Sequence, residues 1–181
     1  MDNAMEIHNI EIKARCGDLD HAHSVCREIG SRFDTIEEQD DTFYTIPRGR
    51  LKLRRSSTLG AQLIFYIRPD QAAARSSEGV RIPVSGPEDL HRILEISLGT
   101  WARVKKTRHV YWLDNIKIHL DQVEGLGTFI EFEAVLSGIP EADRDMGRET
   151  QRIFELMPRF GLRKEDLLAH AYADMPLRQN V

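Results

Sequence analysis

The sequence predicts an α+β protein in which about eight mostly antiparallel strands close into a β-barrel, flanked by four or five helices. Polar or charged residues recur at every second position through many segments that are otherwise apolar. Alternate residues of a strand point to the same face of a sheet, so each segment presents one polar face and one aliphatic face. One such strand is typical of a solvated surface. The repetition, with both signs of charge present, favours a barrel closed around a polar interior.

Length and composition indicate one soluble globular domain over residues 1–181. Charged residues make up 30% of the chain, hydrophobic residues make up 41%, and the net charge is −4. No nucleic-acid partner is expected, because such partners usually select a basic surface. We find no signal-peptide pattern and no run of transmembrane length, so we expect a cytoplasmic protein without a membrane partner. Cys16 and Cys26 lack CxxC spacing and are expected to be reduced core residues.

The first half of the chain is expected to contain five strands and one helix. Asp18 is a candidate N-cap for a helix over 19–29, and Gly30 is a candidate stop. The polar, Ala-rich stretch 69–77 is expected to be a mobile loop. The expected strands cover residues 6–16, 41–46, 50–56, 61–68 and 78–84, and the third and fourth of these are expected to form a hairpin.

The second half is expected to continue with a helix, three strands and a helical tail. Pro87 and the acidic residues after it mark a helix start, and this helix carries Leu90, Ile93 and Leu94 on one face. Two apolar stripes predict two helices between about 140 and 175. The expected strands cover residues 101–113, 116–123 and 128–136, with a two-residue turn at Asp114-Asn115 between the first two.

The polar strand faces would place more bases than acids inside the barrel. Because buried unpaired charge is costly, an excess of cations favours a polyanionic ligand such as a polyphosphate. The carboxylates include a cluster suited to a hard divalent cation, Mg²⁺ or Mn²⁺. His119 shares a strand face with Asp121 and is a candidate hydrogen-bonding group. The candidate bases are Lys13, Lys52, Arg54, Arg68, Arg81, Lys106 and Arg108, and the candidate acids are Glu11, Asp121, Glu131 and Glu133.

Several motifs resemble those of the CYTH superfamily, the triphosphate tunnel metalloenzymes. Asn9-Ile10-Glu11-Ile12-Lys13 resembles the ExExK signature of that family. Leu51-Lys52-Leu53-Arg54, Lys106-Thr107-Arg108 and the glycine-containing run from Asp121 to Glu133 match later elements in order. The resemblance covers about residues 6–136, and the tail ending in Ala171-Tyr172-Ala173-Asp174 fits as well. It implies an eight-stranded antiparallel tunnel, which agrees with the strand count above.

The resemblance also implies roles for the candidate residues. Glu11, Lys13, Glu131 and Glu133 would be catalytic, and Asp121 would help with a second metal or position a lysine. The triphosphate would be bound by Lys13, Lys52, Arg54, Arg68, Lys106 and Arg108, with Arg81, His119 and Asp121 as further substrate-binding candidates. Mg²⁺ or Mn²⁺ would be held by Glu11, Glu131, Glu133 and Asp121.

Members of this superfamily include triphosphatases and class IV adenylyl cyclases, so two enzyme functions stay open. The first is metal-dependent hydrolysis of tripolyphosphate, ATP or thiamine triphosphate. The second is conversion of ATP to cyclic AMP and pyrophosphate. A third function, binding of polyphosphate or a nucleotide without turnover, is suggested by Asn9, which stands where the signature has its first Glu. By resemblance, a homodimer is also possible.

Overall fold

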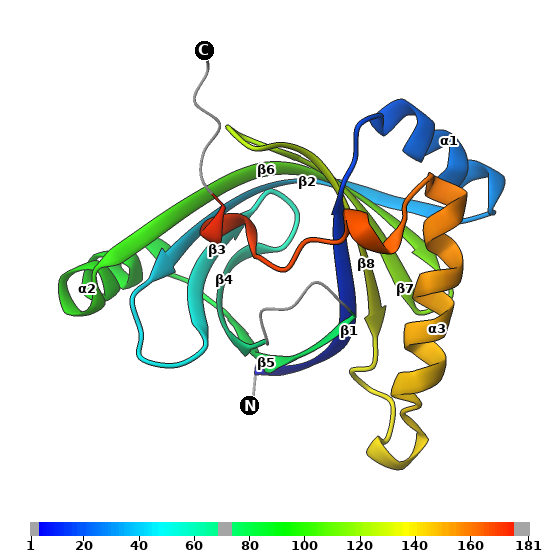
Figure 1. Ribbon diagram of the computed structural model, residues 1–181. Helices are drawn as coiled ribbons and strands as arrows, with labels where there is room; N and C mark the ends of the chain where they lie inside the picture. The colour runs from blue at the N-terminus through cyan, green and yellow to red at the C-terminus, as the bar shows by residue number, and fades with distance from the viewer. Residues whose placement is uncertain (1–3, 69–73, 176–181) are drawn as a thin grey trace.

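The computed structural model describes residues 4–68 and 74–175, and within these ranges eight antiparallel strands form a closed barrel (Figure 1). Around the barrel the strands lie in the order β1-β5-β4-β3-β2-β6-β7-β8, and β8 pairs with β1 to close it. This confirms the predicted α+β barrel. The strands are β1 (Met5–Arg15), β2 (Arg32–Tyr44), β3 (Arg50–Ser56), β4 (Gly60–Ile67), β5 (Arg75–Pro83), β6 (Thr100–Leu113), β7 (Ile116–Val123) and β8 (Gly127–Val135).

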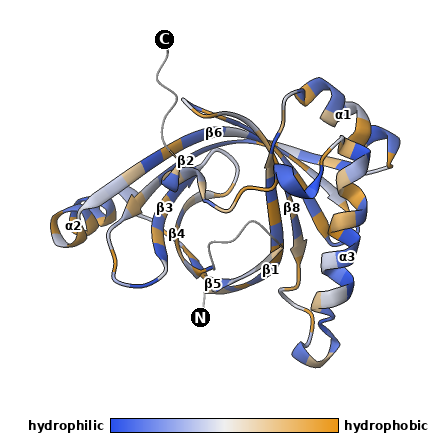
Figure 2. Cartoon of the chain, in the orientation of Figure 1, coloured by the Kyte–Doolittle hydropathy of each residue, from blue (hydrophilic) through white to orange (hydrophobic). Residues whose placement is uncertain are grey.

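The alternating sequence pattern decides which side chains face the interior. In Figure 2, hydrophilic and hydrophobic colours alternate along the strands. Glu11 and Lys13 of β1 line the interior, whereas Ile10 and Ile12 are buried in the core outside the barrel. A shift of register by one residue would turn every charge outward, so the buried aliphatic face fixes the polar face.

Two helices cover the side of the barrel formed by β1, β7 and β8 (Figure 1). They are α1 (Leu19–Glu28) and α3 (Met146–Leu156). Asp18 and Asp145 cap them, each accepting a backbone N–H from the first helical turn. Val25 and Ile153 pack with the outward aliphatic residues of the three strands to form the main core. This core therefore supports the strands that carry Glu11, Glu131 and Glu133.

After α3 the chain crosses one end of the barrel (orange to red in Figure 1). The backbone N–H of Leu168 donates to the carbonyl of Lys13 in β1 at 2.8 Å. Asp174 forms an ion pair with Arg50 at 2.8 Å. These attachments on opposite sides of the barrel end place Tyr172 in the cavity lining, with 6% of its surface exposed.

Two strand predictions are corrected. β2 begins at Arg32 and has thirteen residues, where only a short strand over 41–46 was predicted. It pairs along nearly its whole length with the fourteen-residue β6, so sheet pairing overrides the weak strand propensity of its acidic stretch. Residues 75–77 of the predicted mobile loop belong to β5, which pairs with β1 there. The rest of that prediction, residues 69–73, lies outside the described residues.

One helix prediction is confirmed and one is corrected. α2 (Pro87–Leu98) forms as predicted but buries none of its residues, and Ile93 is 62% exposed. The second helix of the tail is replaced by short 3₁₀ turns over Lys164–Asp166 and Tyr172–Asp174, because the backbone there bonds to β1. The described part of the chain therefore has three α-helices.

The helices that are described are all too short or too polar to span a membrane. Both cysteines are free, as predicted. Cys26 is fully buried in the main core and Cys16 packs at its edge.

Candidate active site inside the barrel

The barrel encloses a cavity of about 760 Å³ with a densely charged lining. Asp121 is fully buried and is not among the residues that line the cavity, but it contacts the lining through Arg108. The other eleven of the twelve predicted site residues do line it: Glu11, Lys13, Lys52, Arg54, Arg68, Arg81, Lys106, Arg108, His119, Glu131 and Glu133.

The lining is more balanced in charge than the sequence predicted. In the described part of the chain it contains eight Lys or Arg side chains and seven Asp or Glu side chains. The prediction missed Lys117 on β7 and the acids of β2, of which Glu37 and Asp41 are buried. Their spacing carried the usual signal, since Glu37, Gln39 and Asp41 lie two residues apart. The signal was missed because β2 was expected to start only at residue 41.

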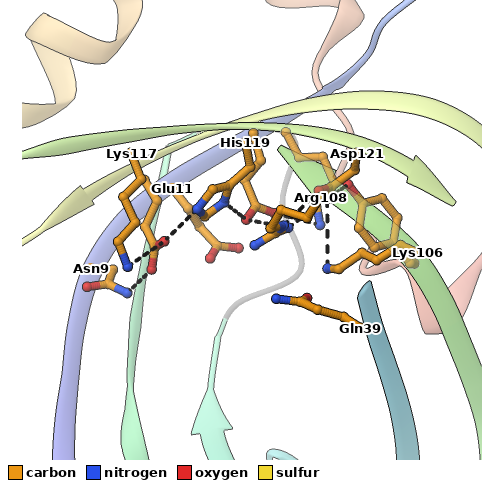
Figure 3. A network of polar contacts seen from close by, with 12 residues as sticks. Asn9, Glu11, Gln39, Lys106, Arg108, Lys117, His119 and Asp121 are labelled. Carbon is orange, nitrogen blue, oxygen red and sulfur yellow. Dashed lines mark hydrogen bonds and ion pairs between the residues drawn. The ribbon is translucent and has the colours of Figure 1, made fainter. Parts of the chain in front are cut away.

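One group of contacts centres on Asp121, where β6 and β7 run side by side (Figure 3). Arg108 Nε and Nη2 donate to the two Asp121 oxygens at 2.7 and 2.6 Å. The Tyr172 hydroxyl donates to Asp121 Oδ2 at 2.7 Å, and Lys106 Nζ lies 3.7 Å from the same oxygen. Three protein groups therefore engage Asp121, which favours a positioning role over a role as a metal ligand.

A second group centres on Glu131, between its strand neighbours Lys13 and His119. Lys13 Nζ lies 2.9 Å from Glu131 Oε2, while His119 Nδ1 and Arg108 Nη2 lie 3.0 and 3.2 Å from Oε1. Lys13 Nζ also lies 3.7 Å from the centre of the Tyr172 ring. Glu131 thus joins cations from two different strands at one point of the barrel.

A third group lies across the cavity on β2 and β3. Asp41 is 2% exposed and accepts from Lys52 Nζ at 2.8 Å and from Arg54 Nε and Nη2 at 2.7 Å each. Arg68 forms a further ion pair in the lining, with Glu11 of β1. Most lumen cations are therefore already paired, so an anionic ligand has to take them from carboxylate partners.

Two lysines of the interior, Lys106 and Lys52, have lowered pKa values. Burial, reinforced by Arg108 and only partly opposed by Asp121, lowers the pKa of Lys106 to about 7. Burial and the neighbouring Arg54 lower the pKa of Lys52 to about 8, against the opposing effect of Asp41. Both side chains therefore lose their protons more readily than surface lysines do. A nearby anion would raise their pKa values again.

The carboxylate of Glu131 shows the opposite balance. Burial alone would raise the pKa of Glu131, but Lys13 and Arg108 outweigh burial and hold that pKa well below its usual range. Burial and Arg108 lower the pKa of His119, although Glu131 opposes them. The interior therefore presents an ionised carboxylate beside a neutral imidazole at pH 7.

Several buried polar atoms have no hydrogen-bond partner among the described residues. The donors are Nε and Nη2 of Arg68 and Nε of Arg81, and the acceptors are Asn9 Oδ1 and Gln39 Oε1. An unpaired buried polar group is costly, so such atoms indicate places where a ligand is expected to bind. Phosphate oxygens would satisfy the guanidinium donors.

The oxygen donors fit a hard divalent cation in their chemistry. Glu11, Glu131 and Glu133 offer carboxylates, and Asn9 offers the unpartnered amide oxygen. Each of these carboxylates contacts a basic side chain. Across residues 4–68 and 74–175, no three His, Cys, Asp or Glu side chains are grouped as a ready-made metal site. These oxygen donors suit a divalent metal. An anion that bound the basic side chains would free the carboxylates to coordinate the metal.

Comparison with known proteins gives consistent matches. The family model described as the CYTH domain matches residues 8–172. A Methanocaldococcus jannaschii protein named "putative adenylate cyclase" is 22% identical over 173 residues, covering 92% of this chain and 97% of that protein. The structure of PH1012 protein from Pyrococcus horikoshii has a TM-score of 0.77 and 26% identity, covering 97% of this chain and 100% of that one. A Hippeastrum structure, named "putative adenylyl cyclase" and described as having a dominant triphosphatase activity, shares the fold with a TM-score of 0.61 and 15% identity, covering 92% of both chains.

Proposed function

This chain belongs to the CYTH domain family, and on that premise we propose that it is an enzyme acting on a triphosphate-containing small molecule inside the barrel. The observation that carries the proposal is the presence of buried guanidinium donors that lack an acceptor, on Arg68 and Arg81. Guanidinium groups pair naturally with phosphate oxygens, and these two line a cavity shared with six further Lys and Arg side chains.

The charged groups suggest how the phosphates are held. Lys13 and Arg108 both contact Glu131, so their donors converge on one part of the cavity. Lys52 and Arg54 converge on Asp41 in the same way on the facing strands. A chain of phosphates between these two pairs replaces both carboxylates as the acceptor, and the cations then offset the charge that shifts during reaction.

Divalent metal fits the same site. Glu11, Glu131 and Glu133 would hold Mg²⁺ or Mn²⁺, which when bound supplies charge to offset the phosphate oxygens. In the hydrolase we favour, water attacks the terminal phosphorus and the bond to the bridging oxygen breaks. Lys13 and Arg108 stabilise the negative charge on the oxygens around that phosphorus, and the fixed barrel strands keep attacking and leaving oxygens in line.

An adenylyl cyclase is the second candidate. Its support is the name of the curated relative and the apolar part of the lining, which suits an organic group attached to the phosphates. That part includes Met5, Ile7, Val110 and Val135. In this reaction the ribose 3′-hydroxyl attacks the α-phosphorus and pyrophosphate leaves, so the same cations would stabilise a different pair of oxygens.

A product assay separates these functions. Metal-stripped protein receives Mg²⁺ or Mn²⁺ and is offered tripolyphosphate, ATP and thiamine triphosphate, and phosphate, pyrophosphate and cyclic AMP are quantified. We expect phosphate release that Glu131→Gln abolishes and that Glu124→Gln, a change at an exposed turn, leaves intact. Cyclic AMP with equal pyrophosphate would instead establish the cyclase. Tight triphosphate binding without any product would refute an enzyme and support the binding function suggested by Asn9.

A further inference from the structure

Lys117 lines the cavity on the same strand face as His119. The pairing of β7 with β8 places it opposite Glu133, and Lys117 Nζ lies 4.0 Å from Glu133 Oε2. On its other side, Nζ lies 5.0 Å from the centre of the Trp112 ring, within the range of a cation–π contact. Its side chain is 24% exposed, so the ammonium group is held beside the carboxylate and is still accessible to a ligand.

Asn9 approaches the same carboxylate from β1 (Figure 3). Asn9 Nδ2 donates to Glu133 Oε1, and His119 Nε2 lies 3.6 Å from Glu133 Oε2. Glu133 is therefore surrounded by an ammonium group, an amide and an imidazole. The ExExK signature has a carboxylate at the position where this chain has the neutral amide of Asn9.

The charges at this end of the carboxylate cluster cancel without a metal. A hard divalent cation is best held by several carboxylates, but between Asn9 and Glu133 only one is present. Lys117 would also repel a second cation close to Glu133. A phosphate oxygen, in contrast, is attracted by the ammonium group and accepts a hydrogen bond from it.

We propose that Lys117 is a resident cation of the site, which neutralises Glu133 in place of a divalent metal and contacts a phosphate of the bound triphosphate. This inference rests on the proposed function, because it assigns a further residue to the same triphosphate site. It also narrows the metal site proposed above from three carboxylates to two, because Glu133 then serves mainly to position Lys117. The metal is held chiefly at Glu11 and Glu131.

The first test measures Mn²⁺ binding to the metal-stripped full chain without any anion, by the loss of the free-ion EPR signal. Lys117→Gln removes the repelling charge, so we expect Mn²⁺ affinity to rise by about tenfold or more. Lys117→Arg keeps the charge and should behave as wild type. The matched control is Lys105→Gln, at an exposed position of β6 outside the cavity, which should change nothing. Equal or weaker Mn²⁺ binding by Lys117→Gln would overturn the proposal.

The second test measures tripolyphosphate binding by calorimetry in EDTA, where no metal contributes. We expect Lys117→Gln to weaken binding by about tenfold, and Lys117→Arg to restore most of it. Binding that is the same in Lys117→Gln and Lys105→Gln would overturn the role of Lys117 alone. Failure of the wild type to bind tripolyphosphate, with or without Mn²⁺, would overturn the proposed function itself. Thermal unfolding of each variant checks that the barrel is intact.

Discussion

A carboxylate inside this barrel stabilises the fold by pairing with buried cations, and it also competes with an anionic ligand for those cations. Asp41→Asn is the change that best separates these two effects. Asp41 is buried and holds Lys52 and Arg54 through three contacts of 2.7–2.8 Å. Removing one partner of a buried ion pair costs ~3–5 kcal/mol. The two cations are 12% and 14% exposed, so some hydration remains and the lower value applies. For a chain of this size, ~3 kcal/mol corresponds to a fall in Tm of about 6–12 °C.

The same change should strengthen anion binding. In the wild type a polyphosphate must displace Asp41 from Lys52 and Arg54, whereas in Asp41→Asn no charge competes for them. We expect the Kd for tripolyphosphate to fall by about tenfold, the order expected for one charge at a partly solvated contact. Thermal unfolding with and without tripolyphosphate, together with calorimetry, measures both effects.

Asp40→Asn is the matched control, because Asp40 is the adjacent residue on the opposite face of β2. It pairs with Arg103, whose side chain is 60% exposed, and such surface pairs contribute ~0–1 kcal/mol. Its Tm and its Kd for tripolyphosphate should therefore stay close to those of the wild type. Equal loss of stability in the two variants, or weaker anion binding by Asp41→Asn, would refute the idea that Asp41 is the internal competitor of the ligand.

Tyr172→Leu removes the hydrogen bond to Asp121 and the ring beside Lys13, so the KM for the triphosphate should rise by about tenfold. Tyr172→Phe keeps the ring, so its KM should rise by less. Steady-state kinetics compares them, and equal effects would contradict a role for the ring. Because the pKa of Lys106 is about 7, tripolyphosphate affinity in EDTA should weaken as pH rises from about 6 to 9 and the ammonium charge is lost. Calorimetry across that range should show a flatter profile for Lys106→Met, and a flat wild-type profile would contradict the assignment.

The fold was predictable where local pattern and burial agree. β1 was predicted to within one residue at each end, because its alternating pattern is regular and its aliphatic face packs against two helices. β2 was mostly missed, since residues such as Glu37 and Glu38 have weak strand propensity and are held by pairing with β6. Pairing between segments that are distant in sequence produces no local pattern from which a strand can be predicted.

The sequence predicted which strand residues face the interior of the barrel, but it did not predict which residues they pair with there. Alternation alone placed Lys13, Lys106 and Arg108 inside the barrel, where the structure has them. Tyr172 lies in a tail segment that was predicted to be helical, whereas it enters the barrel end because that segment is attached to β1 and β3. Asp41 stood at the first position of the predicted strand and Glu37 lay outside it, so their alternation was not recognised and the interior seemed more cationic than it is.

The most direct test of the central claim is a crystal structure of the protein with tripolyphosphate and Mn²⁺, in which anomalous scattering locates the metal. The account predicts the anion inside the barrel, within hydrogen-bond distance of Arg68, Arg108 and Arg54, with Asp41 and Glu131 released from their basic partners. An anion bound on the outer surface, or one inside that leaves every internal ion pair intact, would contradict it.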